Sequence, residues 1–279
     1  MTPTEIKSAL AIVGGGANKL LGQHFLIDAA TLQDVVRAAD VQPEDRVLEI
    51  GPGLGVLTNA LIERGAHVTA IEKDTRFAEW LPQQPWARGH LVLMRGDAVA
   101  LDWNAFTNEK PWKFVANLPY AITSFALRLA LFAQHPPTHV SVLVQREVAE
   151  RITDPKKTSL VSLMVALATA ETRIIRRVPP GAFFPPPKVD SAVLAMSVLS
   201  HEERATRWGI LPEEVMALAK KGFAHPRKRL ASNLELKPET WEAVRAEIVD
   251  NIHARPEELR PETWVALAKS IKNHAKTGI

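Results

Sequence analysis

The chain of 279 residues contains no cysteine. A disulfide framework, a thiolate metal site and a cysteine nucleophile are therefore excluded. No apolar run approaches the roughly 18 residues of a membrane span, and the apolar run at residues 9–13 is too short for the core of a signal peptide. We therefore expect a cytoplasmic protein that has no membrane partner and binds no metal.

A large excess of charge of one sign is also lacking, because the formal net charge is only +3. Hydrophobic residues make up 46% and charged residues 23%, which is ordinary for a soluble globular protein. The charge is unevenly distributed, since residues 140–234 contain 15 Lys and Arg against 9 Asp and Glu. A basic region favours a polyanionic partner such as nucleic acid, although a solvated charged surface explains the same excess.

Short apolar runs alternate with helical patterns along the first half of the chain. These runs predict buried strands at residues 46–50, 67–71, 91–94, 114–117 and 139–145. Strands that alternate with helices are typical of βαβ units. The sequence therefore predicts the α/β class, with a doubly wound, mainly parallel sheet.

The segments around this pattern are less regular. Residues 1–18 predict a short helix followed by a break at three glycines, and residues 22–26 have the composition of a surface loop. Asp28 is a candidate N-cap for a helix that extends to about residue 39. Residues 193–198 predict a last strand.

A glycine-rich loop follows the first predicted strand. Gly51, Gly53 and Gly55 form the pattern Gly-x-Gly-x-Gly. In the dinucleotide fingerprint the third glycine comes one place later, and the helix N-terminus binds a pyrophosphate. Here Pro52 also removes one backbone amide. The loop therefore suits a ligand without phosphate, since glycine lets a backbone approach a ligand closely.

Acidic or amide side chains follow the next three predicted strands. Glu72 ends the second strand, Asp97 follows the third, and Asn117 ends the fourth. Taken singly, Glu72 and Asp97 are also explained as helix N-caps or solvated loop acids. Because ligands bind beyond the carboxyl ends of parallel strands, we expect these side chains to converge on one site. Glu72 can accept hydrogen bonds from both ribose hydroxyls and Asp97 can accept one from an adenine amine, so the set points to S-adenosylmethionine as the cofactor.

The loop after the fourth strand reads Asn117-Leu118-Pro119-Tyr120 and contains the only tyrosine of the chain. The Asn117 amide oxygen and the Leu118 carbonyl can both accept a hydrogen bond from one exocyclic amine. Tyr120 can stack on a flat ring. The loop is similar to the [Asn/Asp/Ser]-Pro-Pro-[Tyr/Phe] loop of amino-group methyltransferases. A plain strand-to-helix turn is the alternative, because Asn and Pro both favour turns.

Five motifs occur in order along the chain. They are Gly-Gln-His-Phe-Leu at 22–26, Glu-Ile-Gly-Pro-Gly at 49–53, Asn-Leu-Pro-Tyr at 117–120, Gln-Arg-Glu-Val-Ala-Glu-Arg at 145–151 and Phe-x-Pro-Pro-Pro-Lys-Val-Asp-Ser-Ala-Val at 183–193. Together they resemble the small-subunit ribosomal RNA adenine dimethyltransferase family (KsgA). The likeness extends weakly to Arg-Pro-Glu-Glu-Leu at 255–259. The sequence is similar, less closely, to the erythromycin-resistance methyltransferases (Erm).

The resemblance implies a class I, Rossmann-like methyltransferase fold with a small helical C-terminal domain. The implied division is an N-terminal extension at 1–18, a catalytic domain at 19–200 and the helical domain at 201–279. Contacts to S-adenosylmethionine are implied for His24, Leu26, Gly51, Glu72, Asp97 and Asn117. Tyr120 and Phe183 are implied to sandwich a flipped adenine.

Three positions depart from the family pattern. His24 stands where many members have Asn, Thr158-Ser159 stand where the family often has Tyr-Gly, and Pro226 stands at the first Arg of Phe-x-x-Arg-Arg-Lys. A histidine can still donate a hydrogen bond. Lys188 and residues 227–229 would hold RNA phosphates without reading sequence.

The implied reaction is dimethylation of N6 on two adjacent adenosines in the 3′-terminal hairpin of small-subunit rRNA. The implied partner is the assembling 30S particle, and we expect a monomer. One alternative is an Erm-type activity on large-subunit RNA, and another is a ribosome-assembly factor that keeps the pocket but not the turnover. A dinucleotide-dependent oxidoreductase is disfavoured by the glycine spacing.

Overall fold

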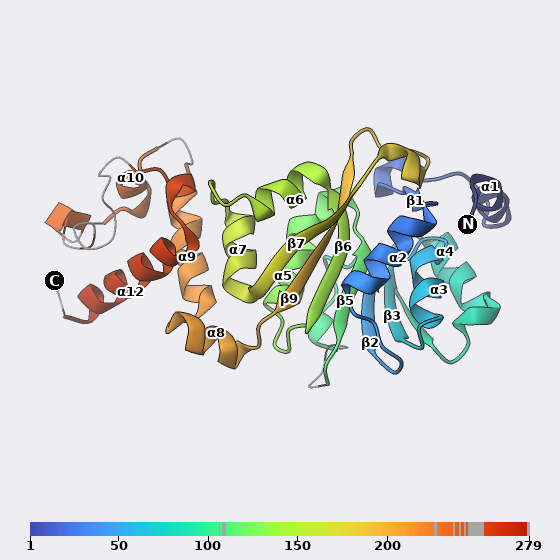
Figure 1. Ribbon diagram of the computed structural model, residues 1–279, viewed down its shortest axis with the longest axis horizontal. Coiled ribbons are helices and arrows are strands. Elements are labelled where there is room, and N and C mark those ends of the chain that lie inside the picture. The colour runs from blue at the N-terminus through green and yellow to red at the C-terminus, as the bar shows by residue number, and fades with distance from the viewer. Residues whose placement is uncertain are drawn as a thin grey trace. The chain divides into compact units, whose positions relative to one another are not determined.

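The computed structural model describes most of the chain. The described residues are 1–105, 107, 110–225, 228–236, 238–239, 241–242, 244 and 254–277. By internal packing the chain divides into two compact units, which are described separately (Figure 1). The first unit contains Met1–Ala149 and Ala170–Val198, and the second contains Glu150–Thr169 and Leu199–Ile279.

A seven-stranded sheet forms the centre of the first unit. Its order is β4-β3-β2-β5-β6-β9-β7. The strands are β2 (Arg46–Ile50), β3 (His67–Glu72), β4 (Leu91–Arg95), β5 (Lys113–Asn117), β6 (His139–Gln145), β7 (Thr169–Val178) and β9 (Ser191–Val198). The pairs from β4 to β6 are parallel, whereas β9 pairs with β6 antiparallel. The predicted α/β class and the doubly wound, mainly parallel sheet are confirmed.

The order of the strands fixes where a ligand can bind. The chain passes from β2 outward to β3 and β4 on one side, and then returns to β5 and β6 on the other side. The carboxyl ends of β2 and β5 therefore lie at the point where the strand order reverses. In open α/β sheets the ligand crevice forms at this switch point.

Helices alternate with the strands and continue into the second unit. The α-helices are α1 (Pro3–Ile12), α2 (Ala29–Ala38), α3 (Val56–Ile62), α4 (Thr75–Trp80), α5 (Thr123–Leu131), α6 (Arg146–Thr153), α7 (Leu160–Ala168), α8 (His201–Trp208), α9 (Pro212–Gly222), α10 (Leu230–Leu234) and α12 (Pro261–Thr277). Short 3-10 helices are η1 (Lys19–Leu21), η2 (Leu81–Gln83), η3 (Pro85–Ala87), η4 (Trp103–Ala105), η5 (Tyr120–Ile122), η6 (Pro180–Ala182) and η7 (Pro256–Glu258). Within the described residues, no helix is both long and apolar enough to cross a membrane.

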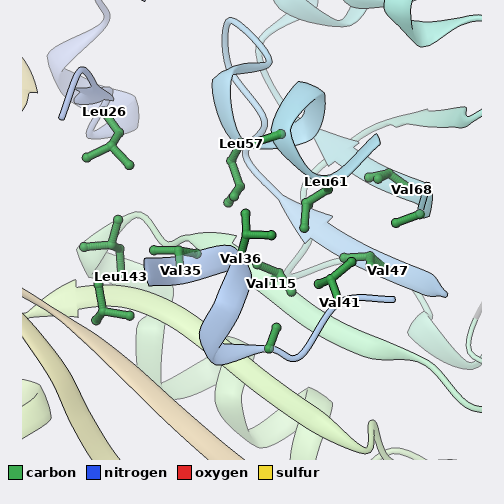
Figure 2. Close-up of a cluster of buried hydrophobic side chains, with 14 of the residues drawn as sticks. Leu26, Val35, Val36, Val41, Val47, Leu57, Leu61, Val68, Val115 and Leu143 are labelled. Atoms are coloured by element: carbon green, nitrogen blue, oxygen red, sulfur yellow. The ribbon is translucent and has the colours of Figure 1, made fainter. Parts of the chain in front are cut away.

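The core of the first unit lies between the sheet and the helices α2 and α3. Figure 2 shows side chains of this cluster meeting from both layers, including Val35 and Val36 of α2, Leu61 of α3, and Val47 and Val115 of the sheet. Burial of each Val or Leu side chain contributes about 1.5–3 kcal/mol. The Asp28 carboxylate accepts a hydrogen bond from the Thr31 amide at 2.8 Å and so caps α2, as its sequence position predicts.

One expectation is wrong. Residues 22–26 were expected to form a surface loop, but Phe25–Leu26 form strand β1, which pairs antiparallel with β8 (Phe183–Phe184). Both side chains of β1 are buried, with 7% and 5% of their surface exposed. A two-residue strand is too short to show a period, and its partner lies about 160 residues further along the chain.

The N-terminal segment packs on the same unit. Its predicted helix is α1, and Gly14 adopts a positive φ of 85° after the helix ends. Ile6 and Leu10 of α1 join a buried cluster with Phe25 and Phe77. Burial of these side chains attaches α1 to the region where β1 lies.

The described part of the second unit is built mainly from helices. Trp208, Val215, Leu230 and Trp264 belong to its buried core. The sequence places Pro-Glu-Thr-Trp at the start of α12 and again at 238–241, but part of the earlier copy lies outside the described residues. The predicted boundaries at residues 18 and 200 stay a prediction.

Candidate functional site

A cavity of about 470 Å³ opens at the carboxyl ends of the strands in the first unit. It lies at the switch point between β2 and β5. All but one of the site residues expected from the sequence line it. They are His24, Leu26, Gly51, Gly53, Glu72, Asp97, Asn117, Leu118, Pro119, Tyr120 and Phe183.

The exception is Gly55, which does not line the cavity. It is the N-cap of α3 and has a φ of 79°. A Cβ atom at this position would lie 2.6 Å from Cη2 of Trp86. The glycine is therefore required by close packing and by a left-handed backbone. The predicted cofactor contact at Gly55 has no support in this geometry.

The other two glycines shape the cavity floor. Gly51 and Gly53 have φ values of 68° and 57°, in the region that favours glycine. A Cβ at Gly53 would lie 3.0 Å from Cε1 of Phe25. The Gly51 amide donates to the Ile71 carbonyl at 2.9 Å, which extends the β2–β3 register into the loop. A ligand can thus approach this backbone closely.

Glu72 is fixed by backbone amides at the end of β3. Its two carboxylate oxygens accept hydrogen bonds from the Gly53 amide at 3.0 Å and the Asp74 amide at 2.7 Å. Only 5% of its surface is exposed. Burial raises the pKa of Glu72, while the Asp74 and Gly53 amides oppose that shift. The carboxylate is held rigidly, and each oxygen retains a lone pair that could accept from a ligand.

Asp97 is more exposed and already paired. Its carboxylate contacts the Lys73 ammonium at 2.7 Å and accepts from the Val99 amide at 3.0 Å. The Lys73 hydrogen bond is the main cause that lowers the pKa of Asp97. Its side chain is 38% exposed. Asp97 is thus a charged acceptor at the rim, and a ligand amine would have to share it with Lys73.

Asn117 is oriented by its neighbour across the cavity. Its Nδ2 donates to the His24 carbonyl at 3.0 Å. This contact fixes the amide orientation, because only the nitrogen can donate to a carbonyl. The Leu118 amide donates to the Leu143 carbonyl at 3.1 Å, which anchors the loop to β6. In the described part of the chain, no hydrogen bond engages Oδ1 of Asn117, so this oxygen is available as an acceptor.

Two aromatic rings complete this side of the cavity. The Tyr120 hydroxyl shares a 2.7 Å hydrogen bond with the Ser191 hydroxyl, and burial raises its pKa. Tyr120 therefore stays neutral in ordinary buffers. Phe183 is only 3% exposed and lies opposite Leu26 in the β1–β8 pair. Ser191, which follows the three prolines in the sequence, thus has a structural role, which is to hold Tyr120.

The histidine of the Gly-Gln-His-Phe-Leu motif also lines the cavity. Its Nδ1 lies 2.7 Å from the Pro185 carbonyl, and the ring therefore donates to that oxygen. The His24 and Tyr120 rings lie nearly parallel, with centroids 6.3 Å apart and planes inclined by 24°. The expected cofactor contact of His24 stays a prediction, but one ring nitrogen is already engaged by the protein.

Glu49 is a site residue that sequence reasoning missed. It lines the cavity, is 1% exposed, and accepts a hydrogen bond from the Thr58 hydroxyl at 2.7 Å. Burial raises the pKa of Glu49 to about 8, and the nearby Glu72 adds to the shift. The available signal was an acidic residue inside the otherwise apolar run Val47-Leu48-Glu49-Ile50.

Two of the departures from the family pattern lie in the second unit. Ser159 caps α7 by accepting from the Ser162 amide at 3.2 Å, and the Thr158 amide donates to the Glu257 carbonyl at 2.8 Å. These residues therefore have local structural roles. Pro226 and Arg227 lie outside the described residues.

Comparison with known proteins is consistent with this geometry. The sequence model of the family described as "Ribosomal RNA adenine dimethylase" matches residues 15–272. The Ribosomal RNA small subunit methyltransferase A of Phenylobacterium zucineum is 40% identical over 235 residues, covering 82% of this chain and 80% of the relative. The protein of the same name from Syntrophotalea carbinolica is 38% identical over 221 residues, covering 77% and 81%.

Two solved structures share the fold over most of their length. The 23S rRNA methyltransferase ErmE is 25% identical, with a TM-score of 0.68, and the match covers 89% of this chain and 99% of that one. A dimethyladenosine transferase from Plasmodium falciparum is 22% identical, with a TM-score of 0.73 and coverage of 92% and 99%, and it shows the fold alone. Since the family model matches nearly the whole chain and relatives with 38–40% identity cover most of it, the chain belongs to the ribosomal RNA adenine dimethylase family.

Proposed function

We propose that this protein transfers methyl groups from S-adenosylmethionine to N6 of two adjacent adenosines in the 3′-terminal hairpin of small-subunit rRNA. The observation that carries the proposal is the single cavity that brings Glu72 and the glycine turn together with the Asn117–Tyr120 loop. The names of the 38–40% identical relatives support the small subunit as the source of the RNA. ErmE, which is named for 23S rRNA, is less similar at 25% identity.

The cofactor site is formed by the residues at the strand ends. Gly51 and Gly53 leave room for a nucleoside, and the buried Glu72 carboxylate accepts from the ribose hydroxyls. Asp97 accepts from the adenine amine at the rim. The fit is supported by the Gly53 position, because Gly53 lines the cavity, has a positive φ, and leaves only 3.0 Å between a Cβ and Cε1 of Phe25, another lining residue. When bound, S-adenosylmethionine supplies an electrophilic methyl group on a sulfonium sulfur.

The acceptor site is formed by the loop after β5. An adenine exocyclic amine is a weak nucleophile because its lone pair is delocalised into the ring. Oδ1 of Asn117 and the Leu118 carbonyl accept its two hydrogens, which localises the lone pair and directs it at the methyl carbon. The bound cofactor would supply the methyl group for the new N–C bond, the electron pair of the broken S–C bond would stay on the cofactor's sulfur, and the methylated amine would lose a proton to water. Positioning and electrostatics account for the rate.

The base must leave its stack to reach this site. Tyr120 and Phe183 hold the flipped base between their faces, which compensates the lost stacking. Lys188 is exposed beside this segment and is available for RNA phosphates, whereas residue 227 lies outside the described residues. We expect the protein to act as a monomer on the assembling 30S particle in the cytoplasm, with a catalytic domain at 19–200, an N-terminal extension at 1–18 and a helical domain at 201–279.

The decisive experiment offers labelled S-adenosylmethionine with undermethylated small subunits and, in parallel, with large-subunit RNA. Label in the small-subunit 3′ hairpin, recovered as dimethyladenosine, is the expected result. Label only in large-subunit RNA would move the protein to the ErmE-like activity. Absence of label from both RNAs would instead favour an assembly factor with little turnover.

A thermal-shift measurement provides an independent control on the cofactor. S-adenosylmethionine should raise the melting temperature, because a ligand that binds only the folded state stabilises it. NAD should have no effect, since the glycine turn lacks the pyrophosphate spacing. A rise with NAD alone would argue against the proposed cofactor.

A further inference from the structure

The residues proposed to receive the adenine come from distant parts of the sequence. Asn117 and Tyr120 follow β5, whereas Phe183 lies in β8. The short loop before β1 lies between these segments in space. One residue of that loop, His24, contacts both of them.

The main chain of His24 orients the asparagine. Its carbonyl accepts the hydrogen bond from Nδ2 of Asn117 at 3.0 Å. Rotation of the Asn117 amide by half a turn would place Oδ1 against this carbonyl, which two acceptors cannot tolerate. The contact therefore leaves Oδ1 for the substrate amine.

The side chain of His24 holds the second segment. Its Nδ1–H donates to the Pro185 carbonyl at 2.7 Å. Pro185 follows β8 directly, and the imidazole supplies a hydrogen-bond partner for its carbonyl oxygen. The histidine thus ties the segment that carries Phe183 to the loop that faces Asn117.

The ring of His24 also faces the tyrosine. The two ring centroids are 6.3 Å apart, and the planes differ by 24°. The far end of Tyr120 is held by the Ser191 hydroxyl at 2.7 Å, and Ser191 is 1% exposed. Tyr120 is therefore restrained at its hydroxyl and flanked on its ring by His24.

We propose that His24 is a positioning residue for the acceptor adenine, which sets the distance between the Phe183–Pro185 segment and the Asn117–Tyr120 loop. This role rests on the proposed function and adds to the cofactor contact expected from the resemblance. The imidazole acts through Pro185 and Tyr120, so it need not touch the reacting atoms. Asparagine at this position could keep the donor to Pro185 but not the ring beside Tyr120.

The second methyl transfer should depend most on this arrangement. The unmodified amine offers two hydrogens to Asn117 and Leu118, whereas the monomethylated amine offers one. With one hydrogen bond lost, the orientation of the base relies more on the surrounding rings. Loosening the rings should therefore allow monomethyladenosine to accumulate.

Three variants separate the two features of the side chain. His24→Asn keeps a donor and removes the ring, His24→Phe keeps a ring and removes the donor, and His24→Ala removes both. Matched controls are His67→Asn, His67→Phe and His67→Ala, because His67 begins β3 and lies outside the cavity lining. Thermal unfolding of all six variants verifies that each is folded.

The expected result is a selective loss on the RNA side. His24→Ala should lower kcat/KM for small-subunit RNA by about 10- to 100-fold, since small misplacements of reacting groups have effects of this size. Because His24 is also an expected cofactor contact, the affinity of this variant for S-adenosylmethionine should fall as well, but by a smaller factor than kcat/KM for RNA. The fraction of product recovered as monomethyladenosine should rise most in His24→Ala. His24→Asn and His24→Phe should lie between this variant and the wild type.

A second readout needs no substrate. Tyr120 is the only tyrosine in the chain, so tyrosine labelled with ¹³C in its ring gives the signal of that one side chain. His24→Ala should shift this signal, and His67→Ala should leave it unchanged. The signal reports ring packing even if methyl transfer is not observed.

The outcomes distinguish this inference from the function on which it rests. A wild-type protein that transfers no methyl group, together with a shifted tyrosine signal in His24→Ala, would contradict the proposed function and support the positioning. A His24→Ala variant with a normal monomethyl fraction and an unshifted tyrosine signal would overturn the positioning. So would a loss of cofactor affinity as large as the loss of RNA turnover.

Discussion

The cavity has two sides that the chain constructs in different ways. The strand-end side consists of Gly51, Gly53, Glu72 and Asp97, which lie at or just after the carboxyl ends of the neighbouring parallel strands β2, β3 and β4. Backbone hydrogen bonds of the sheet continue into these loops, as between the Gly96 amide and the Glu72 carbonyl at 2.9 Å. The regular hydrogen bonding of the sheet therefore suffices to position the residues of this side.

The ring side consists of His24, Asn117, Tyr120 and Phe183. These residues are held by side-chain contacts that reach across 71 to 161 positions of sequence, to Ser191 and Pro185 among others. The contrast teaches that the side proposed to hold the methyl donor is placed by sheet geometry, whereas the side proposed to hold the acceptor depends on a small number of side-chain hydrogen bonds. The two sides should therefore respond differently to substitution.

The largest effect is expected on the ring side, from Asn117→Ala. Loss of the oriented amide oxygen should lower kcat for methyl transfer by about 100- to 1,000-fold, the range found when one preorganised transition-state partner is removed. Labelled-methyl transfer to small-subunit RNA measures the change. The unfolding temperature serves as the control and should stay near that of the wild type. Unchanged turnover would remove Asn117 from the mechanism.

The next largest effect is expected from Glu49→Gln, a change in β2 that should alter the stability of the protein. The folded-state pKa of Glu49 is raised from 4.5 to about 8. Between these values the folded state binds a proton that the unfolded state does not, so the stability of the wild type should fall as the pH rises through this window. Glutamine does not ionise, so the Glu49→Gln variant should not lose stability in this way as the pH rises.

Above pH 8 the free energy of unfolding of the variant should therefore exceed that of the wild type by on the order of 5 kcal/mol, and at pH 4 the two should differ little. Denaturant unfolding at several pH values measures this difference. Tyr120→Phe is the matched ring-side change, because the raised pKa of Tyr120 keeps it neutral across the same window. A constant advantage of Glu49→Gln at every pH would contradict the assigned protonation.

A smaller effect is expected from Tyr120→Ala. Loss of a stacking ring costs about 1–3 kcal/mol per base, which corresponds to a rise in the KM for RNA of about 5- to 150-fold. Tyr120→Phe keeps the ring and loses only the bond to Ser191, so its KM should rise less. Steady-state kinetics with small-subunit RNA tests both. Equal rises in the two variants would assign the role to the hydroxyl and not to the ring.

The smallest effect is expected from Gly55→Ala, which tests whether that glycine belongs to the site. The Cβ would meet Trp86 and would sit on a backbone with positive φ, so the free energy of unfolding should fall by about 2 kcal/mol. Cofactor affinity should remain near that of the wild type. Gly53→Ala is the control, since Gly53 lines the cavity and Gly55 does not. A strong loss of cofactor affinity in Gly55→Ala alone would restore its predicted contact.

The sequence predicts the strand-end side well for a physical reason. Apolar strands and the residues that follow them are local signals, and parallel strands bring their carboxyl ends to one edge. The predicted strand at 139–145 coincides with β6, and Glu72 and Asn117 end β3 and β5 as expected. The glycine spacing alone could not show that Gly55 is needed for packing against Trp86, because Trp86 lies about 30 residues further along the chain.

The ring side was less predictable from local patterns. The pairing of Phe25–Leu26 with Phe183–Phe184 carries no periodic signal, since each strand has only two residues. The contact of His24 with Pro185 depends on that pairing. Glu49 was missed because a strand of five residues with one acid still reads as a buried strand, and nothing in the pattern distinguishes a site acid from a partnered core acid.

The central claim is that the two sides of the cavity have separable roles. The most direct test is an equilibrium titration of S-adenosylmethionine into Glu72→Gln and Tyr120→Ala, alongside the wild type. The account predicts that Glu72→Gln loses at least about tenfold in affinity, because the Gly53 and Asp74 amides both need an acceptor oxygen. It predicts that Tyr120→Ala stays within about threefold of the wild type. Equal losses in both variants would contradict the division into a cofactor side and an acceptor side.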